Sequence, residues 1–193
     1  MKHIVIGLDP SINSTGICIR DANNTFNKYY LFPSKITNKS LDWIQNIDWI
    51  KVYNYEKTPI NNINDYSTKE SIKFKNTIKV YDLIETVINK LSDEYIIDYI
   101  VMEGVSYGSV SGAALIDLAF LNAVLRLMFI KKNLKFYIVS PKEVKKQAIG
   151  NGNADKDLMI MSWKKLDKKT QSIPDFVKCD DLADAYFMAH YSV

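Results

Sequence analysis

The order in which strand-like and helix-like segments follow one another most narrows the folds open to this chain. Three short apolar segments come first, with polar turns between them, and predict an antiparallel meander: His3–Leu8, Thr15–Arg20 and Phe26–Phe32. The later segments are a helix at about Ile72–Leu91, a strand at Tyr99–Met102, a helix at Ala113–Lys132, a strand at Phe136–Val139, and helices at about Pro141–Ile149, Ala154–Leu166 and Asp180–Tyr191.

This order predicts an α/β fold with a mixed five-stranded sheet. Three antiparallel strands would be joined by two parallel ones, with helices on both faces. A chain of 193 residues is long enough for one domain with a sizeable core, so we expect a single domain over residues 1–193. The segment at about 40–76 is rich in aromatic residues and asparagine but has no clear period, and we interpret it as an insertion.

The composition excludes several classes of protein. Two cysteines and two histidines at unrelated spacings cannot form a zinc cluster or a disulfide framework. No apolar run reaches membrane-spanning length without a charge or an amide, and the N-terminus lacks a signal-peptide cleavage site. We therefore expect a soluble protein of the cytoplasm, either bacterial or that of a host cell. The net charge of +3 permits a nucleic-acid partner without arguing strongly for one.

Four acidic residues stand at positions that the predicted fold would bring together. Asp9 ends the first strand and Glu103 ends the fourth. If these strands are parallel neighbours, both carboxylates lie at the carboxyl edge of the sheet, where ligands bind in α/β folds. Asp181 and Asp184 are spaced i, i+3 in the last helix, so they share one of its faces. We expect Asp180 to point elsewhere, into solvent.

Clustered carboxylates favour metal-assisted chemistry. They repel one another and take up protons unless a cation neutralises them. Oxygen ligands without histidine or cysteine favour Mg²⁺, with Mn²⁺ as a substitute. Two such ions about 3.5–4 Å apart can activate water and stabilise the leaving oxygen of a phosphodiester. The acids thus indicate hydrolysis of a nucleic-acid backbone, although each taken singly can also be an ordinary turn, capping or surface residue.

Four motifs, in order along the chain, resemble the RuvC family of Holliday-junction resolvases. They are Gly-Leu-Asp-Pro-Ser-Ile-Asn-Ser-Thr-Gly at 7–16, Ile-Val-Met-Glu at 100–103, Val-Lys-Lys-Gln-Ala-Ile-Gly-Asn-Gly-Asn-Ala-Asp-Lys at 144–156 and Asp-Leu-Ala-Asp-Ala at 181–185. The first motif also resembles the start of actin-like ATPases and kinases, but the chain is too short for the second lobe of an actin-like ATPase.

The resemblance implies a ribonuclease H-like fold and an endonuclease that resolves Holliday junctions by paired symmetric nicks. It also implies two Mg²⁺ ions per active site. The implied catalytic residues and metal ligands are Asp9, Glu103, Asp181 and Asp184. Lys145 and Lys156 match family positions that contact DNA near the scissile phosphate, and Lys146 is a further candidate for DNA contact. The alternative for Lys145 and Lys146 is a solvated helix face.

The sequence departs from the family pattern at two places. The insertion at about 40–76 lengthens the gap between the first two acids. After Glu103 the family carries an aromatic residue that stacks at the junction, and strict alignment places Ser106 there. Tyr107 replaces that aromatic if the chain shifts by one residue, since an aromatic ring can stack on an unpaired base. The alternative is an ordinary loop tyrosine.

The helix at 113–131 is apolar on nearly every face, which predicts that it is buried on both sides. One side can cover the sheet, and the other needs a partner. The resemblance implies a homodimer through this helix, with two active sites on opposite arms of a four-way junction of branched DNA. The alternative is that the insertion covers the helix.

Two rival functions stay open at this point. A debranching endonuclease that cuts flaps or forks would use the same chemistry with a looser preference for DNA structure. A non-catalytic DNA-binding module could have the same fold. The acidic residues argue against such a module, because a protein that only binds DNA has no need of clustered negative charge facing phosphates.

Overall fold

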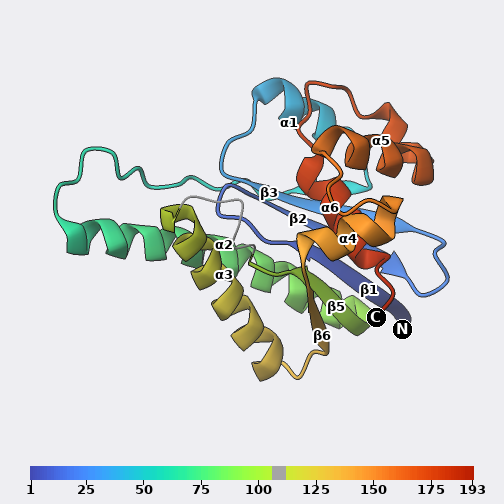
Figure 1. Ribbon diagram of the computed structural model, residues 1–193, viewed down its shortest axis with the longest axis horizontal. Helices are drawn as coiled ribbons and strands as arrows, with labels where there is room; N and C mark the ends of the chain where they lie inside the picture. The colour runs from blue at the N-terminus through green and yellow to red at the C-terminus, as the bar shows by residue number, and fades with distance from the viewer. Residues whose placement is uncertain (106–111) are drawn as a thin grey trace.

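A six-stranded mixed sheet forms the centre of the computed structural model, which describes residues 1–105 and 112–193 (Figure 1). The strands lie in the order β4-β3-β2-β1-β5-β6. Their bounds are β1 Lys2–Asp9, β2 Ser14–Asp21, β3 Asn27–Pro33, β4 Ile50–Val52, β5 Tyr95–Glu103 and β6 Phe136–Val139. β1, β2 and β3 pair antiparallel, whereas β5 runs parallel to β1 and β6 parallel to β5. The predicted meander and parallel pairs are therefore confirmed.

Helices cover both faces of this sheet. Figure 1 shows α2 and α3 on one face, and α6 on the other with α4 and α5 beside it. The bounds are α1 Asn38–Gln45, α2 Tyr66–Glu94, α3 Gly112–Lys131, α4 Pro141–Ile149, α5 Lys156–Leu166 and α6 Asp180–Ala189, with a short 3-10 helix, η1, at Lys168–Ser172. No helix in the described part of the chain is both long and apolar enough to cross a membrane.

Alternation along the strands decides which side chains meet α6. Successive residues of a strand point to opposite faces of the sheet. In β1, Leu8 packs into the core beneath α2 and α3, so Gly7 and Asp9 face α6. In β5, Met102 joins that same core, and Glu103 therefore faces α6 as well. The two acids at the strand ends thus point to the same side of the sheet.

The register of the two parallel strands sets these acids at the same height. β1 and β5 pair in parallel up to Leu8 and Met102. Asp9 and Glu103 are each one residue further along. Both therefore lie at the carboxyl edge of the sheet, beside the turn from β1 to β2.

Two glycines allow α6 to lie directly on the sheet. A Cβ atom at Gly7 would stand 2.0 Å from the carbonyl oxygen of Ala185, and one at Gly16 would stand 2.1 Å from that of Asp181. Any larger residue would push the helix away. The close approach brings Asp181 and Asp184 down to the strand ends that carry the other two acids.

The sequence-based fold differs from the structure in several details, among them helix α1, which the sequence analysis did not expect. The sheet has six strands instead of five, because the segment at 40–76 contains β4, which pairs in parallel with β3. A strand of three residues is too short to leave a periodic pattern. α2 begins at Tyr66 instead of about Ile72, since Asp65 caps it by accepting a 2.6 Å hydrogen bond from the backbone N–H of Thr68. α5 likewise begins after its cap at Asp155 instead of at Ala154.

Candidate active site

The four predicted acids lie together at the carboxyl edge of the sheet. Asp9 is buried, with 7% of its surface exposed, and Glu103, Asp181 and Asp184 are half-buried. The strand register and the close approach of α6 bring these acids near one another, and charges on Glu103, Asp184 and Asp181 each raise the pKa of Asp9. Three separate elements, β1, β5 and α6, thus bring these side chains into one cluster.

Asp9 and Glu103 form the innermost pair of the cluster. Burial raises the pKa of Asp9 well above its ordinary value, and the charge of Glu103 and a hydrogen bond with it raise the pKa further. Burial also raises the pKa of Glu103, while that hydrogen bond and nearby Lys145 lower it. The hydrogen bond between the two carboxyl groups thus raises the pKa of Asp9 and lowers that of Glu103.

The two acids of α6, Asp181 and Asp184, also have raised pKa values. Burial raises the pKa of Asp184 to about 7, and the charges of Glu103 and Asp181 add to the rise. Burial raises the pKa of Asp181 to about 6, against a hydrogen bond from the Ser14 side chain that lowers it. Such a cluster takes up protons near neutral pH. A divalent cation bound there would neutralise the repulsion between the carboxylates and so favour their ionised form.

Two of the predicted lysines reach this cluster. Lys145 lies on α4, where its ammonium donates a 2.7 Å hydrogen bond to the carbonyl oxygen of Ala154. Its charge lowers the pKa values of Glu103 and Asp184. Lys156, the first residue of α5, lowers the same two pKa values. Both lysines thus lie near the acids, and their contact with DNA stays a prediction.

Local sequence explains why Lys145 is held in place. α4 begins with a capping box, in which Ser140 and Glu143 satisfy each other's backbone N–H groups, and Pro141 takes the first turn. The helix ends at Gly150, whose φ of 78° is accessible to glycine without strain. Both ends of the short helix are therefore fixed.

The other two predicted DNA contacts, Lys146 and Tyr107, both stay predictions, for different reasons. Lys146 lies exposed on α4, and its ammonium has no hydrogen bond or ion pair with another described residue. Its placement is what a solvated helix face requires, and its contact with DNA stays a prediction. Tyr107 lies outside the described residues, so its stacking role also stays a prediction.

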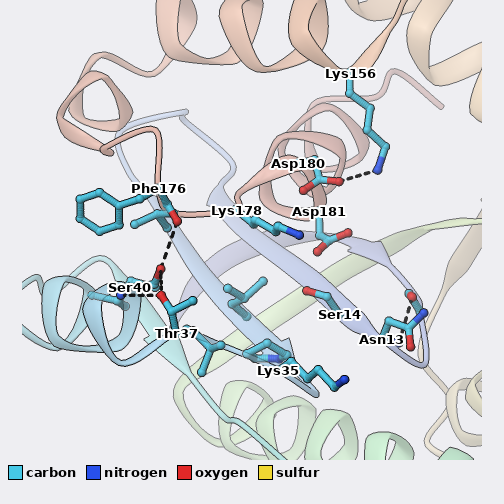
Figure 2. A pocket seen from close by; sticks show the side chains of 16 residues that line it. Asn13, Ser14, Lys35, Thr37, Ser40, Lys156, Phe176, Lys178, Asp180 and Asp181 are labelled. Atoms are coloured by element: carbon cyan, nitrogen blue, oxygen red, sulfur yellow. Dashed lines mark hydrogen bonds and ion pairs between the residues drawn. The ribbon is translucent and has the colours of Figure 1, made fainter.

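Asp180 corrects one sequence-based expectation. Instead of pointing into solvent, its carboxylate accepts a hydrogen bond of 2.5 Å from Lys156, and Figure 2 shows the two side chains joined at the rim of a pocket. The pairing raises the pKa of Lys156. Ser14 is a second residue that the sequence did not single out; it lies inside the first motif and turns its hydroxyl toward Asp181 (Figure 2).

The donor set fits Mg²⁺ or Mn²⁺ chemically, but it is not a ready-made cage. Four carboxylates provide only hard oxygen ligands. Among residues 1–105 and 112–193, however, no three acidic, histidine or cysteine side chains stand in an arrangement that could hold one ion. The strand register and the close approach of α6 nevertheless place the acids near one another. Binding would therefore require rotation of carboxylates, beginning with the hydrogen-bonded pair of Asp9 and Glu103.

Comparisons with known proteins agree with this geometry. A family model described as crossover junction endodeoxyribonuclease RuvC matches residues 48–190, which include Glu103, Asp181 and Asp184 but not Asp9. No curated protein sequence matches the chain.

Solved structures similar to this one include a Thermus thermophilus RuvC structure, with a TM-score of 0.58 at 13% identity, over 96% of this chain and 90% of that one. Another is T. thermophilus RuvC in complex with a Holliday junction substrate, with a TM-score of 0.55 at 14% identity and the same coverage. The likeness supports the predicted fold over 96% of the chain, a larger share than the family model matches.

Proposed function

Because the chain belongs to the RuvC family of crossover junction endodeoxyribonucleases, we propose that it resolves four-way DNA junctions by paired, symmetric, cation-dependent nicks. The observation that supports the chemistry is the cluster of acids at the end of β1, the end of β5 and the start of α6. A protein that only bound DNA would gain nothing from such a cluster, since it repels phosphates.

Asp9, Glu103, Asp181 and Asp184 are the residues that would hold two divalent cations. Bound there, the cations would stabilise the charge on the attacking and leaving oxygens of a phosphodiester. The chain's own residues prepare the site for this role. Asp9 is buried and Glu103 half-buried, and the charges of Lys145 and Lys156 offset part of the repulsion that a phosphate would meet.

The proposal of paired nicks includes a homodimer through α3. α3 buries one side, including Leu121 and Phe129, against the sheet and α2, but Leu127 and Ile130 are 49% and 65% exposed. The insertion does not cover these two residues. Phe74, which belongs to both the insertion and α2, packs against Phe120 of α3, with ring centroids 6.2 Å apart. A second copy packed on the exposed side would match the two-fold symmetry of a four-way junction.

The test compares DNA structures as substrates. We expect the wild-type protein with Mg²⁺ to nick a synthetic four-way junction symmetrically and faster than a flap, a Y-fork or a linear duplex. Glu103→Gln keeps the size of the side chain and removes its charge. We expect it to slow junction cleavage by about 100-fold or more, beyond the loss of an outer-shell partner of a metal site.

The outcomes separate the rival functions. Equal rates on all four substrates would replace junction resolution by general debranching. Absence of cleavage by the wild-type protein, with tight junction binding, would leave a non-catalytic binding module.

A further inference from the structure

Two adjoining pockets extend from the acidic cluster toward the insertion. The first has a volume of about 540 Å³ and is lined by Asp181, Lys156 and residues of the loops before α1 and α6 (Figure 2). The second, of about 500 Å³, is lined by Lys57, Lys73 and other residues of the insertion, α2 and α3. Both pockets are lined by Asn13, Ser14, Lys35 and Lys178, so together they form one continuous groove.

Five lysines and three carboxylates line this groove: Lys35, Lys57, Lys73, Lys156 and Lys178, with Asp117, Asp180 and Asp181. Lys156 is paired with Asp180 and Lys73 with Glu70, at 2.5 and 2.7 Å. Among the described residues, neither Lys35 nor Lys178 has a hydrogen bond or ion pair with another side chain. The charges at the middle of the groove are therefore left for an anion from outside.

Lys35 and Lys178 come from different loops and enter the first pocket from different sides. Lys35 precedes α1 and Lys178 precedes α6, and Figure 2 shows the Lys178 side chain extending across the pocket in the direction of Asp181. Phe176, which is 40% exposed, lies at the rim. The ammonium of Lys39 lies over its ring, 4.1 Å from the ring centroid. The groove thus combines cations with an exposed aromatic ring, as nucleic-acid surfaces do.

The insertion is fastened to the edge of the sheet that carries the acids. The side chain of Asn76 exchanges hydrogen bonds of 2.9 and 3.0 Å with the backbone of Thr58. Lys57 donates a 2.8 Å hydrogen bond to the side chain of Asn13, and the Tyr55 hydroxyl bonds the backbone of Ile12 in the same turn. The far wall of the groove is therefore fixed to the β1–β2 turn, beside Asp9.

We propose that this groove binds the sugar–phosphate backbone of a DNA strand that continues from the acidic cluster toward the insertion, with Lys35 and Lys178 as its phosphate contacts. The inference rests on the proposed function, because it places the strand that the acids cut. A long groove with cations spread along it suits a polymer of phosphates, whereas a single small anion needs donors converging on one point. The insertion, on this proposal, lengthens the DNA-binding surface.

The test is the salt dependence of junction binding, measured in EDTA so that no cleavage occurs. For the full chain, the logarithm of the binding constant for a four-way junction falls linearly with the logarithm of KCl concentration. Each phosphate contact contributes about 0.9 to the slope. We expect the double variant Lys35→Ala, Lys178→Ala to make this slope less steep by about 2. The double variant Lys35→Arg, Lys178→Arg should retain the wild-type slope.

The matched control is Lys168→Ala, an exposed lysine of η1 outside the groove, which should leave the slope unchanged. If the wild-type protein cleaves junctions but the double alanine variant keeps the wild-type slope, the groove is not a phosphate site and the proposed function stands. If the slope falls as expected but the wild-type protein never cleaves DNA, the groove is supported and the nuclease is lost.

Discussion

At the scale of single residues, the protonation of the acidic cluster links stability to pH and to metal. The pKa values of Asp181 and Asp184 are raised to about 6 and about 7, from about 4 in an unfolded chain. A raised carboxyl pKa stabilises the fold most at a pH below the unfolded value, and this contribution is lost as the pH rises through the folded value. The metal-free protein should therefore lose stability between about pH 4 and pH 7.

We expect Asp184→Asn to reduce this loss, because the amide has no charge to bury. At pH 8 the metal-free variant should melt several degrees above the wild type, where about 1 kcal/mol corresponds to about 2–4 °C in a chain of this size. Mg²⁺ should raise the wild-type melting temperature more at pH 8 than at pH 5. The control is Asp93→Asn, an exposed acid of α2. A wild-type melting temperature that rises from pH 5 to pH 8 without metal would contradict the prediction.

The sequence could indicate the acids but not all of their neighbours. Asp9 and Glu103 were predictable because each ends an apolar strand, and Asp181 and Asp184 because of their helical spacing. The contact of Asp180 with Lys156 joins residues 24 positions apart on two different helices, and no pattern along the chain encodes it. The Ser14 hydroxyl reaches Asp181 only because α6 lies on β2.

At the scale of elements, the seating of α6 on the sheet determines whether the site exists. Gly16 leaves room for the carbonyl oxygen of Asp181, which would be 2.1 Å from a Cβ atom. We expect Gly16→Ala to lower the free energy of unfolding by about 1–3 kcal/mol, as overpacking does, and to reduce cleavage because Asp181 is displaced.

Urea unfolding and junction cleavage together measure this effect. Gly112→Ala is the matched control, because a Cβ atom there meets nothing within 4 Å. Equal stability and cleavage for both alanine variants would show that α6 does not depend on the close contact.

The elements differ in how well the sequence predicts them. The apolar strands and α3 could be placed within a few residues because each is a continuous apolar run that ends at polar or turn-forming residues. β4 was missed since a strand of three residues is held by its neighbour β3, a contact that local sequence does not reveal. α1 was missed in the same segment, although Thr37 caps it and accepts a hydrogen bond from the backbone N–H of Ser40.

At the scale of the whole molecule, the exposed side of α3 predicts the assembly. Leu127→Lys and Ile130→Lys place charges where a second copy would bury apolar side chains. Full burial of each such side chain stabilises the dimer by about 1.5–3 kcal/mol. We expect the double variant to sediment as a monomer at concentrations where the wild type is a dimer, and to lose symmetric paired nicking. Met161→Lys, at an equally exposed apolar residue of α5, should remain dimeric. A wild type that sediments as a monomer at micromolar concentration would contradict the dimer.

The most direct measurement places a single sulfur at a non-bridging oxygen of the scissile phosphate in a four-way junction. Mg²⁺ binds sulfur poorly, whereas Mn²⁺ accepts it better. With Mg²⁺, we expect the sulfur to slow wild-type cleavage strongly. Replacing Mg²⁺ by Mn²⁺ should then raise the rate on the sulfur-substituted junction by at least about tenfold. The variant Asp9→Asn should show no such recovery. Cleavage without any divalent cation, or an equal effect of sulfur with both ions, would contradict the proposal that these acids hold cations against a phosphodiester.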